Sequence, residues 1–336
     1  MELENIIQNI ENSPKGYLIK NKQFINYLTK TINFCYQIKG NDLTFPAPQP
    51  VSLERKDFEK LQKYQYSVSL KLDGIRFLLY FIKDKNERNQ CILINRALNF
   101  YCIYLDVDQS MFNGTLLDGE LIYNNQFNRW DFSIHDAILL NGNKVNKLPH
   151  SVRLSDARLC LNSFVNYYNE NNVLYLYVKN FYSFDNFEIF KKEIFDESKN
   201  NDGIIFMPEN LPVISGTQYS MLKWKPHDKH TFDFLIKESE IGFEAYVYHM
   251  SNLKLFANIH IKTEEGKAFI ENCKKLLNYK EDCIVECTFN NKINNFTPIL
   301  IRTDKTHPNS LRTIERTLFN INENIQLEEF VELLKK

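Results

Sequence analysis

Hydrophobic and polar residues alternate through the first two thirds of the chain, and this alternation predicts β-strands. It is clearest over 66–70 and 75–81, where every second residue is apolar. Further apolar blocks predict strands at 91–95, 101–105, 115–123, 130–140, 174–179 and 203–207. Helical spacing predicts helices near 54–63, 152–168 and 186–199. We therefore expect a first domain that is rich in sheet and contains a few helices.

The last third of the chain shows a second β-rich stretch and then a helical pattern. Short strands broken by polar turns are predicted over 230–302. From Gln326 onward, four apolar residues follow the i, i+3, i+4, i+7 spacing of a helix face: Leu327, Phe330, Val331 and Leu334. Because such a stripe has to be buried, we expect this helix to pack on the first domain. The turn-like sequence at 226–228 predicts a domain boundary near 226–232.

The composition is that of an ordinary globular protein with room for two domains. The chain has 336 residues, of which 43% are hydrophobic and 25% charged, and its net charge is −1. This balance creates no general attraction to nucleic acid, so any such contact needs a local basic pocket. No segment approaches the roughly 20 apolar residues of a membrane span. The start of the chain lacks a secretion signal, so we expect an intracellular protein without a membrane partner.

The seven cysteines are scattered, and none forms a C-x-x-C pair. Cys283 and Cys287 lie on the same side of an alternating stretch, which predicts a strand facing a core. A zinc site is the less favoured interpretation of this pair. Scattered free thiols indicate a reducing compartment.

Lys71 lies where an apolar strand meets a turn, in the sequence SLKLDGIR at 69–76. A lysine at its usual pKa of about 10.4 is protonated at neutral pH and cannot attack an electrophile. Burial or nearby cations lower that pKa and free the amine. Gly74 permits close approach of backbone and ligand, and Arg76 offers a planar set of donors for phosphate or sugar oxygens. Because an exposed strand end can carry the same residues, the hypothesis of a nucleophilic lysine depends on further motifs.

Two acid–glycine pairs follow, each beside a predicted strand. The first is LDGEL at 117–121, where a carboxylate can bind a ribose hydroxyl or a divalent metal. Taken alone, that motif is better explained as a hairpin turn. The second is Asp202-Gly203, which opens a buried strand. Asp202 is therefore a candidate to hold a metal ion beside phosphates.

A pair of lysines flanks Trp224 in the sequence LKWKP at 222–226. Strand alternation places Lys223 and Lys225 on one face and the tryptophan on the other. Two adjacent ammonium groups suit a polyanion, and they lower the pKa of a neighbouring lysine. A solvated strand face is the alternative interpretation.

Two further basic clusters end predicted strands. Arg302 and Lys305 flank Asp304 after the second β-rich stretch, where they could clamp phosphates or form an exposed turn. Arg96 follows the strand at 91–95 and could reach a sugar, although a surface ion pair is the simpler interpretation when it is taken alone. The joint presence of all these clusters at strand ends favours a nucleotide site.

In this order the motifs resemble those of the covalent nucleotidyltransferases, which comprise mRNA capping guanylyltransferases and ATP-dependent polynucleotide ligases. The similarity is greatest to the capping enzymes, above all to the compact form of chloroviruses. It extends from about residue 45 and includes the segments 50–60 and 320–325. It implies an α+β fold in which a two-sheet antiparallel nucleotidyltransferase domain (1–232) precedes an OB-fold β-barrel (233–324). A C-terminal helix (325–336) would return to the first domain.

The resemblance also implies residue roles. Lys71 becomes covalently guanylylated, and the other implied catalytic residues are Asp73, Lys223 and Lys225. The ribose is contacted by Arg76 and Arg96, and Lys179 lies near the guanine. The full set implied to bind nucleotide is Arg76, Arg96, Glu120, His135, Lys179, Lys223, Lys225, Asp233, Arg302 and Lys305. The residues implied to hold Mg²⁺ or Mn²⁺ are Asp202 and Glu120.

His135 departs from the family pattern. It occupies the position at which the family has a phenylalanine or tyrosine that stacks on guanine. An imidazole stacks less strongly than these rings, and it titrates near neutral pH. Phe132 and Trp130 are alternatives for base stacking, although both are better explained as core residues.

The implied reaction transfers GMP from GTP to 5′-diphosphate RNA, with separate chains supplying an RNA triphosphatase and a cap methyltransferase. We expect a monomer that acts in the host cytoplasm (a viral factory) or in the nucleus. The alternative enzyme is an ATP-dependent polynucleotide ligase that adenylylates Lys71. A nucleotide-binding scaffold without chemistry is disfavoured, because none of the expected lysines and acids is missing.

Overall fold

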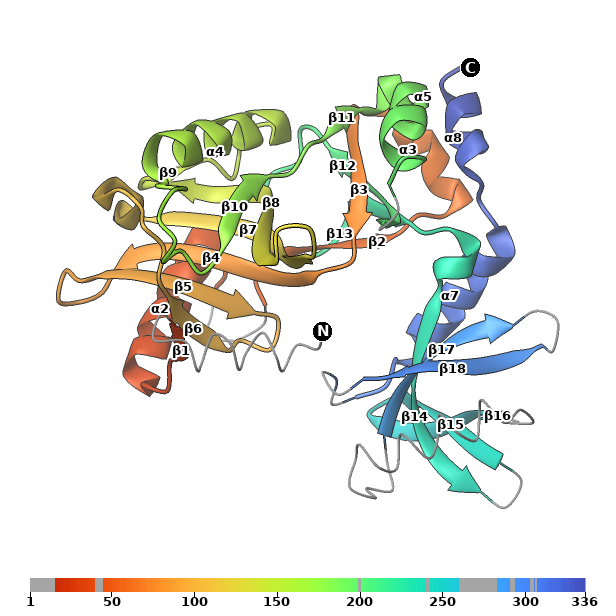
Figure 1. The fold of residues 1–336 in the computed structure, drawn as a ribbon. Coiled ribbons are helices and arrows are strands. Elements are labelled where there is room, and N and C mark those ends of the chain that lie inside the picture. Colours follow the sequence, from red (N-terminus) through yellow and green to blue (C-terminus); the bar gives the residue numbers. More distant parts are fainter. Residues whose placement is uncertain are drawn as a thin grey trace. The chain divides into compact units, whose positions relative to one another are not determined.

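The computed structural model describes residues 16–39, 45–198, 201–239, 242–259, 283–290, 294–302, 305 and 307–335. The chain forms two compact units (Figure 1). Unit 1 contains residues 1–224 and 330–336, and unit 2 contains residues 225–329. Residues 225–232, which the sequence analysis assigned to the first domain, therefore group with the second.

The larger sheet of unit 1 has the strand order β1-β6-β5-β4-β7-β8-β10, with β9 paired to β8. Neighbouring strands are antiparallel except β8 and β10, which run parallel. The bounds are β1 (Gly16–Leu18), β4 (Ile75–Lys83), β5 (Asn89–Asn95), β6 (Phe100–Ile103), β7 (Thr115–Asn124), β8 (Arg129–Leu140), β9 (Asn143–Lys144) and β10 (Tyr175–Val178).

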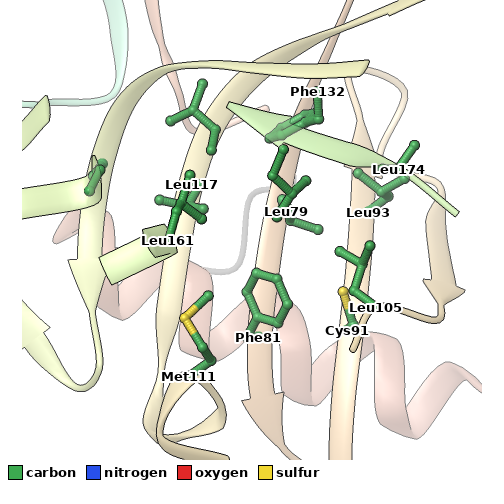
Figure 2. Packing of buried hydrophobic residues seen from close by; sticks show 14 of the residues in the cluster. Leu79, Phe81, Cys91, Leu93, Leu105, Met111, Leu117, Phe132, Leu161 and Leu174 are labelled. Atoms are coloured by element: carbon green, nitrogen blue, oxygen red, sulfur yellow. The ribbon is translucent and has the colours of Figure 1, made fainter. Parts of the chain in front are cut away.

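Each face of this sheet is covered by one helix, because alternate residues of its strands are apolar on both faces. Helix α4 (His150–Phe164) packs Leu161 against the face that carries Leu79 and Phe81. Figure 2 shows this core, in which Phe81 and Leu117 point toward Met111 and Leu161. Helix α2 (Lys22–Tyr36) covers the other face, where its apolar side is buried with Leu78 and Tyr80.

The smaller sheet of unit 1 has the order β11-β3-β12-β13-β2. Its bounds are β2 (Pro48–Ser52), β3 (Tyr66–Leu72), β11 (Tyr182–Ser183), β12 (Asn201–Pro208) and β13 (Gly216–Trp224). All pairs are antiparallel except β13 with β2. Both sheets of unit 1 are thus predominantly antiparallel, as predicted, and each contains one parallel pair.

The helices predicted near this sheet are shorter than expected. The first is a 3₁₀ turn (Arg55–Asp57) followed by α3 (Phe58–Lys63). The one predicted over 186–199 consists of α5 (Phe187–Phe190) and a π-helical turn (Lys191–Phe195).

Helix α8 (Leu327–Leu333) brings an aromatic side chain into unit 1. Phe330 is fully buried, and its ring lies 5.1 Å from that of Phe206 and 5.9 Å from that of Trp224. Phe58 and Phe187 also pack against it. The other face of this small sheet carries Lys71, so Phe330 supports the strands that present the lysine.

Unit 2 contains a five-stranded antiparallel sheet of order β16-β15-β14-β17-β18, which agrees with the predicted OB-fold domain. Its bounds are β14 (Thr231–Ser239), β15 (Gly242–His249), β16 (Asn252–Ile259), β17 (Cys283–Asn290) and β18 (Asn295–Ile301). Phe232, Phe234 and Phe296 form the centre of its core. Helix α7 (Leu311–Glu323) packs on this core through Ile314 and Ile321.

Most predicted strands are confirmed, whereas α2 and α7 were not predicted. Cys287 is buried in the core of unit 2, with Cys283 packed against that core. No cluster of three or more potential metal-ligating side chains (His, Cys, Asp, Glu) occurs among the described residues. Within that part of the chain, no helix combines the length and the apolar character needed to cross a bilayer.

Truncating Phe330 should destabilise unit 1. Phe330→Ala removes a buried ring from between four others, and such substitutions cost about 3–5 kcal/mol. Urea unfolding followed by tryptophan fluorescence measures the change, because both tryptophans of the chain lie in unit 1 and one contacts Phe330. The control is Leu334→Ala, since Leu334 is more than a third exposed. If both variants lost the same unfolding free energy, the packing role of Phe330 would be contradicted.

Candidate active site

A β-bulge brings Asp202 to Lys71. Leu72 of β3 pairs with Asn201 and Leu70 pairs with Ile204, so Asp202 and Gly203 together lie opposite Lys71. Gly203 has a φ of 126°, a conformation that favours glycine and is typical of such irregularities. The Asp202 carboxylate accepts a hydrogen bond from the Lys71 ammonium and forms an ion pair with it. The candidate metal-holding residue therefore contacts the candidate nucleophile.

The small sheet also places Lys223 on the face of Lys71. Ser69 of β3, Ile205 of β12 and Lys223 of β13 lie in one row across three strands. Because side chains alternate, Lys71 shares the face of Ser69. Trp224 lies on the opposite face and is buried. Strand β13 ends at Trp224, so strand alternation does not fix the orientation of Lys225, which belongs to unit 2.

The large sheet contributes Glu120, which pairs in register with Arg76 of β4. The turn between β3 and β4 packs closely against β7 at this point. A Cβ atom on Gly74 would lie 2.6 Å from the Cγ of Glu120 and 2.8 Å from the carbonyl oxygen of Leu121. The close approach that Gly74 permits is therefore to β7, whereas the sequence analysis also expected an approach to ligand.

Lys179 lies beside Glu120 and Lys71. It follows β10, and its backbone N–H donates to the carbonyl of Ile134 over 2.8 Å. Burial, together with the positive charge of Lys71, lowers the pKa of Lys179 to about 8, while Glu120 opposes the shift. Four predicted residues, Lys71, Asp202, Glu120 and Lys179, thus come from both sheets to one site.

A buried cluster of Arg76, Asp118 and His135 supports this site. Arg76 donates to both carboxylate oxygens of Asp118, over 3.0 and 2.6 Å, and to the carbonyl of Pro48 over 2.7 Å. His135 Nε2 lies 3.2 Å from the same carboxylate. Burial alone would raise the pKa of Asp118, but Arg76 and His135 hold it well below its usual range. Asp118 therefore remains an anion that fixes both neighbours.

This arrangement bears on two predicted nucleotide contacts. Arg76 makes three hydrogen bonds to protein atoms, so its guanidinium is held in place by the fold. His135 was expected to stack on the base, and its ring edge is bound to Asp118. The contact with Asp118 therefore fixes the edge of the imidazole.

Two other predicted residues of unit 1 lie at the margin of the site. Arg96 donates to the side-chain oxygen of Gln49 over 2.7 Å. Burial and the neighbouring guanidinium of Arg76 lower its pKa, which places the two arginines close together. Asp73 is exposed in the turn after β3.

In unit 2, Asp233 gathers the cations that the sequence analysis assigned to this domain. Arg302 donates to Asp233 over 3.2 Å and to Glu286 over 3.1 Å, and Lys305 forms an ion pair with Asp233. Asn309 donates to the same carboxylate over 3.1 Å. Asp304 lies outside the described residues.

The sequence analysis missed three buried polar residues that position this site. Asp118 was seen only as part of a motif, although alternation places it on the face of Glu120. Asp136 is bound by Arg153 of α4 over 2.7 and 2.9 Å. His150 Nε2 contacts the carbonyl of His135 over 3.0 Å. The available signal was the Asp136 carboxylate directly before the apolar run 137–140, since buried acids require partners.

Comparison with known proteins identifies the family. The family profile described as "mRNA capping enzyme, catalytic domain" matches residues 6–227, and that of the "mRNA capping enzyme, C-terminal domain" matches residues 217–331. The chain belongs to the mRNA capping enzyme family. This confirms the predicted family and supports a guanylyltransferase over a ligase.

The names of individual relatives agree with this assignment. The mRNA-capping enzyme subunit alpha of Schizosaccharomyces pombe is 27% identical, over 86% of this chain and 79% of its own. The Saccharomyces cerevisiae subunit alpha is 25% identical over 87% and 78%. The mRNA-capping enzyme of Danio rerio is 26% identical over 90% of this chain and 52% of its own. A bacteriophage T7 ATP-dependent DNA ligase covers 76% of this chain with a TM-score of 0.38 and 13% identity, a likeness too low to decide function.

Removing the Asp118 charge should lower stability in a pH-dependent way. At pH 7, Asp118→Asn leaves Arg76 without its anion, which costs about 3 kcal/mol or more. The folded-state pKa of Asp118 is depressed, so its contribution is complete above the unfolded value of about 3.9 and is lost as pH falls below it. Urea unfolding between neutral and acidic pH should show the gap between variant and wild type narrowing below about pH 4.

The control is Asp156→Asn, which removes a partly exposed carboxylate of α4. At pH 7, Asp156→Asn should lower the free energy of unfolding much less than Asp118→Asn does. A gap between Asp118→Asn and wild type that stays constant at acidic pH would contradict the charge assignment.

Proposed function

We propose that this chain is an mRNA guanylyltransferase that carries GMP on the side-chain nitrogen of Lys71. GMP comes from GTP, pyrophosphate is released, and the acceptor is the 5′-diphosphate end of RNA. The observation that carries the proposal is the contact between Lys71 and Asp202, close to Lys179, in a member of the capping family.

In the first half of the reaction, Lys71 Nζ attacks the α-phosphorus of GTP. A P–N bond forms, the bond from the α-phosphorus to the bridging oxygen breaks, and pyrophosphate leaves. The ammonium must first lose a proton, and Asp202 is placed to receive it because it already accepts the hydrogen bond. Most of the remaining work is alignment and charge stabilisation. Lys223, on the face of Lys71, supplies positive charge for the α-phosphate, and Lys225 follows it in sequence.

A divalent ion fits the donors that Asp202 and Glu120 provide. Both are carboxylates, and Mg²⁺ and Mn²⁺ prefer oxygen ligands. Mg²⁺ is commonly held by one or two carboxylates together with substrate phosphates, so a denser protein cluster is not required. When bound, the ion offsets negative charge on the phosphate oxygens.

In the second half, a terminal phosphate oxygen of the RNA attacks the phosphorus of lysyl-GMP. A P–O bond forms, the P–N bond breaks, and Lys71 takes up a proton. Lys179 borders the guanine. Arg76 and Arg96 border the ribose, with Arg76 held by Asp118. His135 completes the base side of the pocket.

Other chains complete the cap. Two of the fungal relatives are named as alpha subunits, which indicates partner subunits in those proteins. We assign the triphosphatase and methyltransferase steps to separate chains here as well, with this chain active as a monomer inside the cell. The compact viral form remains a prediction from sequence.

Replacing Lys71 should abolish the covalent intermediate. Lys71→Ala removes the nucleophile, so incubation with α-labelled GTP and Mg²⁺ should leave no label on denatured protein, while GTP binding is partly retained. Wild type should be labelled by GTP and not by ATP. Lys147→Ala serves as the control, since Lys147 is an exposed lysine elsewhere on unit 1.

A labelled band in Lys71→Ala would overturn the assignment of the nucleophile. Label from ATP alone in the wild type would favour the ligase.

Removing a cation of unit 2 should affect the first half of the reaction more than the second. We assign Lys305 and Arg302, both held by Asp233, to the pyrophosphate of GTP. Lys305→Ala should slow formation of lysyl-GMP about tenfold or more. Transfer from isolated lysyl-GMP to RNA should change less, because no pyrophosphate is present. The control is Lys254→Ala on β16, and equal slowing of both halves by Lys305→Ala would contradict the assignment.

A further inference from the structure

The face of the large sheet that carries Glu120 and Lys179 continues beyond the nucleotide site. On β10, Leu174 and Leu176 point into the core under α4. Alternation therefore places Tyr175, Tyr177 and Lys179 together on the opposite face. Burial raises the pKa of Tyr177, and the charges of Asp131 and Glu120 act in the same direction, which agrees with a row that runs past both carboxylates.

At the far end of this row, Arg129 joins two aromatic rings. Its guanidinium carbon lies 3.7 Å from the ring centre of Tyr175 and 4.8 Å from that of Phe127. Asp131, which pairs with Tyr175 in register, accepts a hydrogen bond from Arg129 Nε over 2.7 Å. The guanidinium is thus held by a carboxylate and by both rings.

The outer ring of this stack is open to solvent. Phe127 lies in the turn between β7 and β8 and is 57% exposed. A phenylalanine with this exposure gains little from folding. Exposed aromatic rings beside a planar cation are the groups on which the bases of single-stranded nucleic acid stack.

We propose that Phe127, Arg129 and Tyr175 form a platform for the acceptor RNA. This inference rests on the proposed guanylyl transfer, because that reaction is what brings a single-stranded 5′ end to Lys71. Tyr175 lies four residues from Lys179 on one strand, or about 13 Å. The platform therefore contacts nucleotides that follow the first one, and it does not contact the reacting diphosphate.

Because of this geometry, binding of an acceptor to the platform depends on the length of the RNA. An acceptor of one nucleotide ends before it reaches Phe127, whereas an acceptor of about ten nucleotides covers a typical stacking site. Stacking is tolerant of base identity, because every base has a π-face. The platform consequently favours longer acceptors without selecting their sequence.

The test measures transfer from isolated lysyl-GMP to 5′-diphosphate acceptors of one nucleotide and of about ten. In wild type the longer acceptor should have the lower KM. Phe127→Ala and Arg129→Ala should each raise the KM for the longer acceptor about tenfold, and should leave the single-nucleotide KM and both kcat values within about twofold. Phe127→Trp should restore the wild-type KM, because it returns a stacking ring.

A matched control is available elsewhere on unit 1. Lys144 Nζ lies 4.0 Å from the ring centre of Phe34 on α2, and Phe34 is exposed. Phe34→Ala removes a comparable cation–π pair far along the chain from the site, and it should leave the KM for both acceptors unchanged.

The outcomes separate the two proposals. If wild type forms no lysyl-GMP, the proposed function fails. If lysyl-GMP forms but the platform variants use both acceptors as wild type does, the platform is refuted and the proposed function stands. An equal loss in Phe34→Ala would also refute the platform, since the effect would then not be specific to Phe127, Arg129 and Tyr175.

Discussion

The contact between Lys71 and Asp202 depends on one extra residue in strand β12. In a regular ladder a single residue would oppose Lys71, and successive side chains of β12 would alternate between the two faces. The bulge inserts Gly203 and so allows Asp202 to reach the lysine. A lysine on a partly buried strand needs a nearby anion when it is charged. The chain meets this requirement with a residue that is also suited to accept a proton or hold a metal ion.

The same rule organises the other charged groups around the site. Asp118 is shared by Arg76 and His135, and Asp136 is bound by Arg153 of α4. In unit 2, Asp233 forms ion pairs with two cations, Arg302 and Lys305. Breaking one member of such a pair is costly, because its partner is left charged and buried. The acids therefore act mainly by holding cations in fixed positions, and those cations are the groups that an anionic nucleotide requires.

The sequence predicted the elements of the site better than their contacts. The strand that carries Lys71 shows clear alternation, and the strands that carry Glu120 and Asp202 contain apolar blocks. The contact between Arg76 and Asp118 joins positions 42 residues apart. It depends on the register between β4 and β7, which a hydrophobic pattern does not reveal.

The two missed helices have different explanations. Helix α2 buries Thr29 and Asn33 among its apolar residues, and these polar side chains obscure its helical pattern. Helix α7 has a regular stripe, Leu311, Ile314, Leu318 and Ile321, so the signal was present. The stripe identifies the face that is buried, but the sequence does not show which strands it meets, because these lie more than 50 residues earlier in the chain, as β15 does.

The return of Phe330 to unit 1 gives unit 2 two connections to unit 1: the backbone near residue 224, and a C-terminal segment from residue 330 that is held in unit 1 by noncovalent packing. A domain joined by a single linker can turn freely about it, whereas a doubly tethered domain can move only in ways that both connections allow. The second tether also keeps the two units at high effective concentration, because neither can diffuse far from the other. A protease cut in one connection would leave the halves joined through the other, and shortening the chain by its last seven residues would remove a core side chain from the catalytic unit.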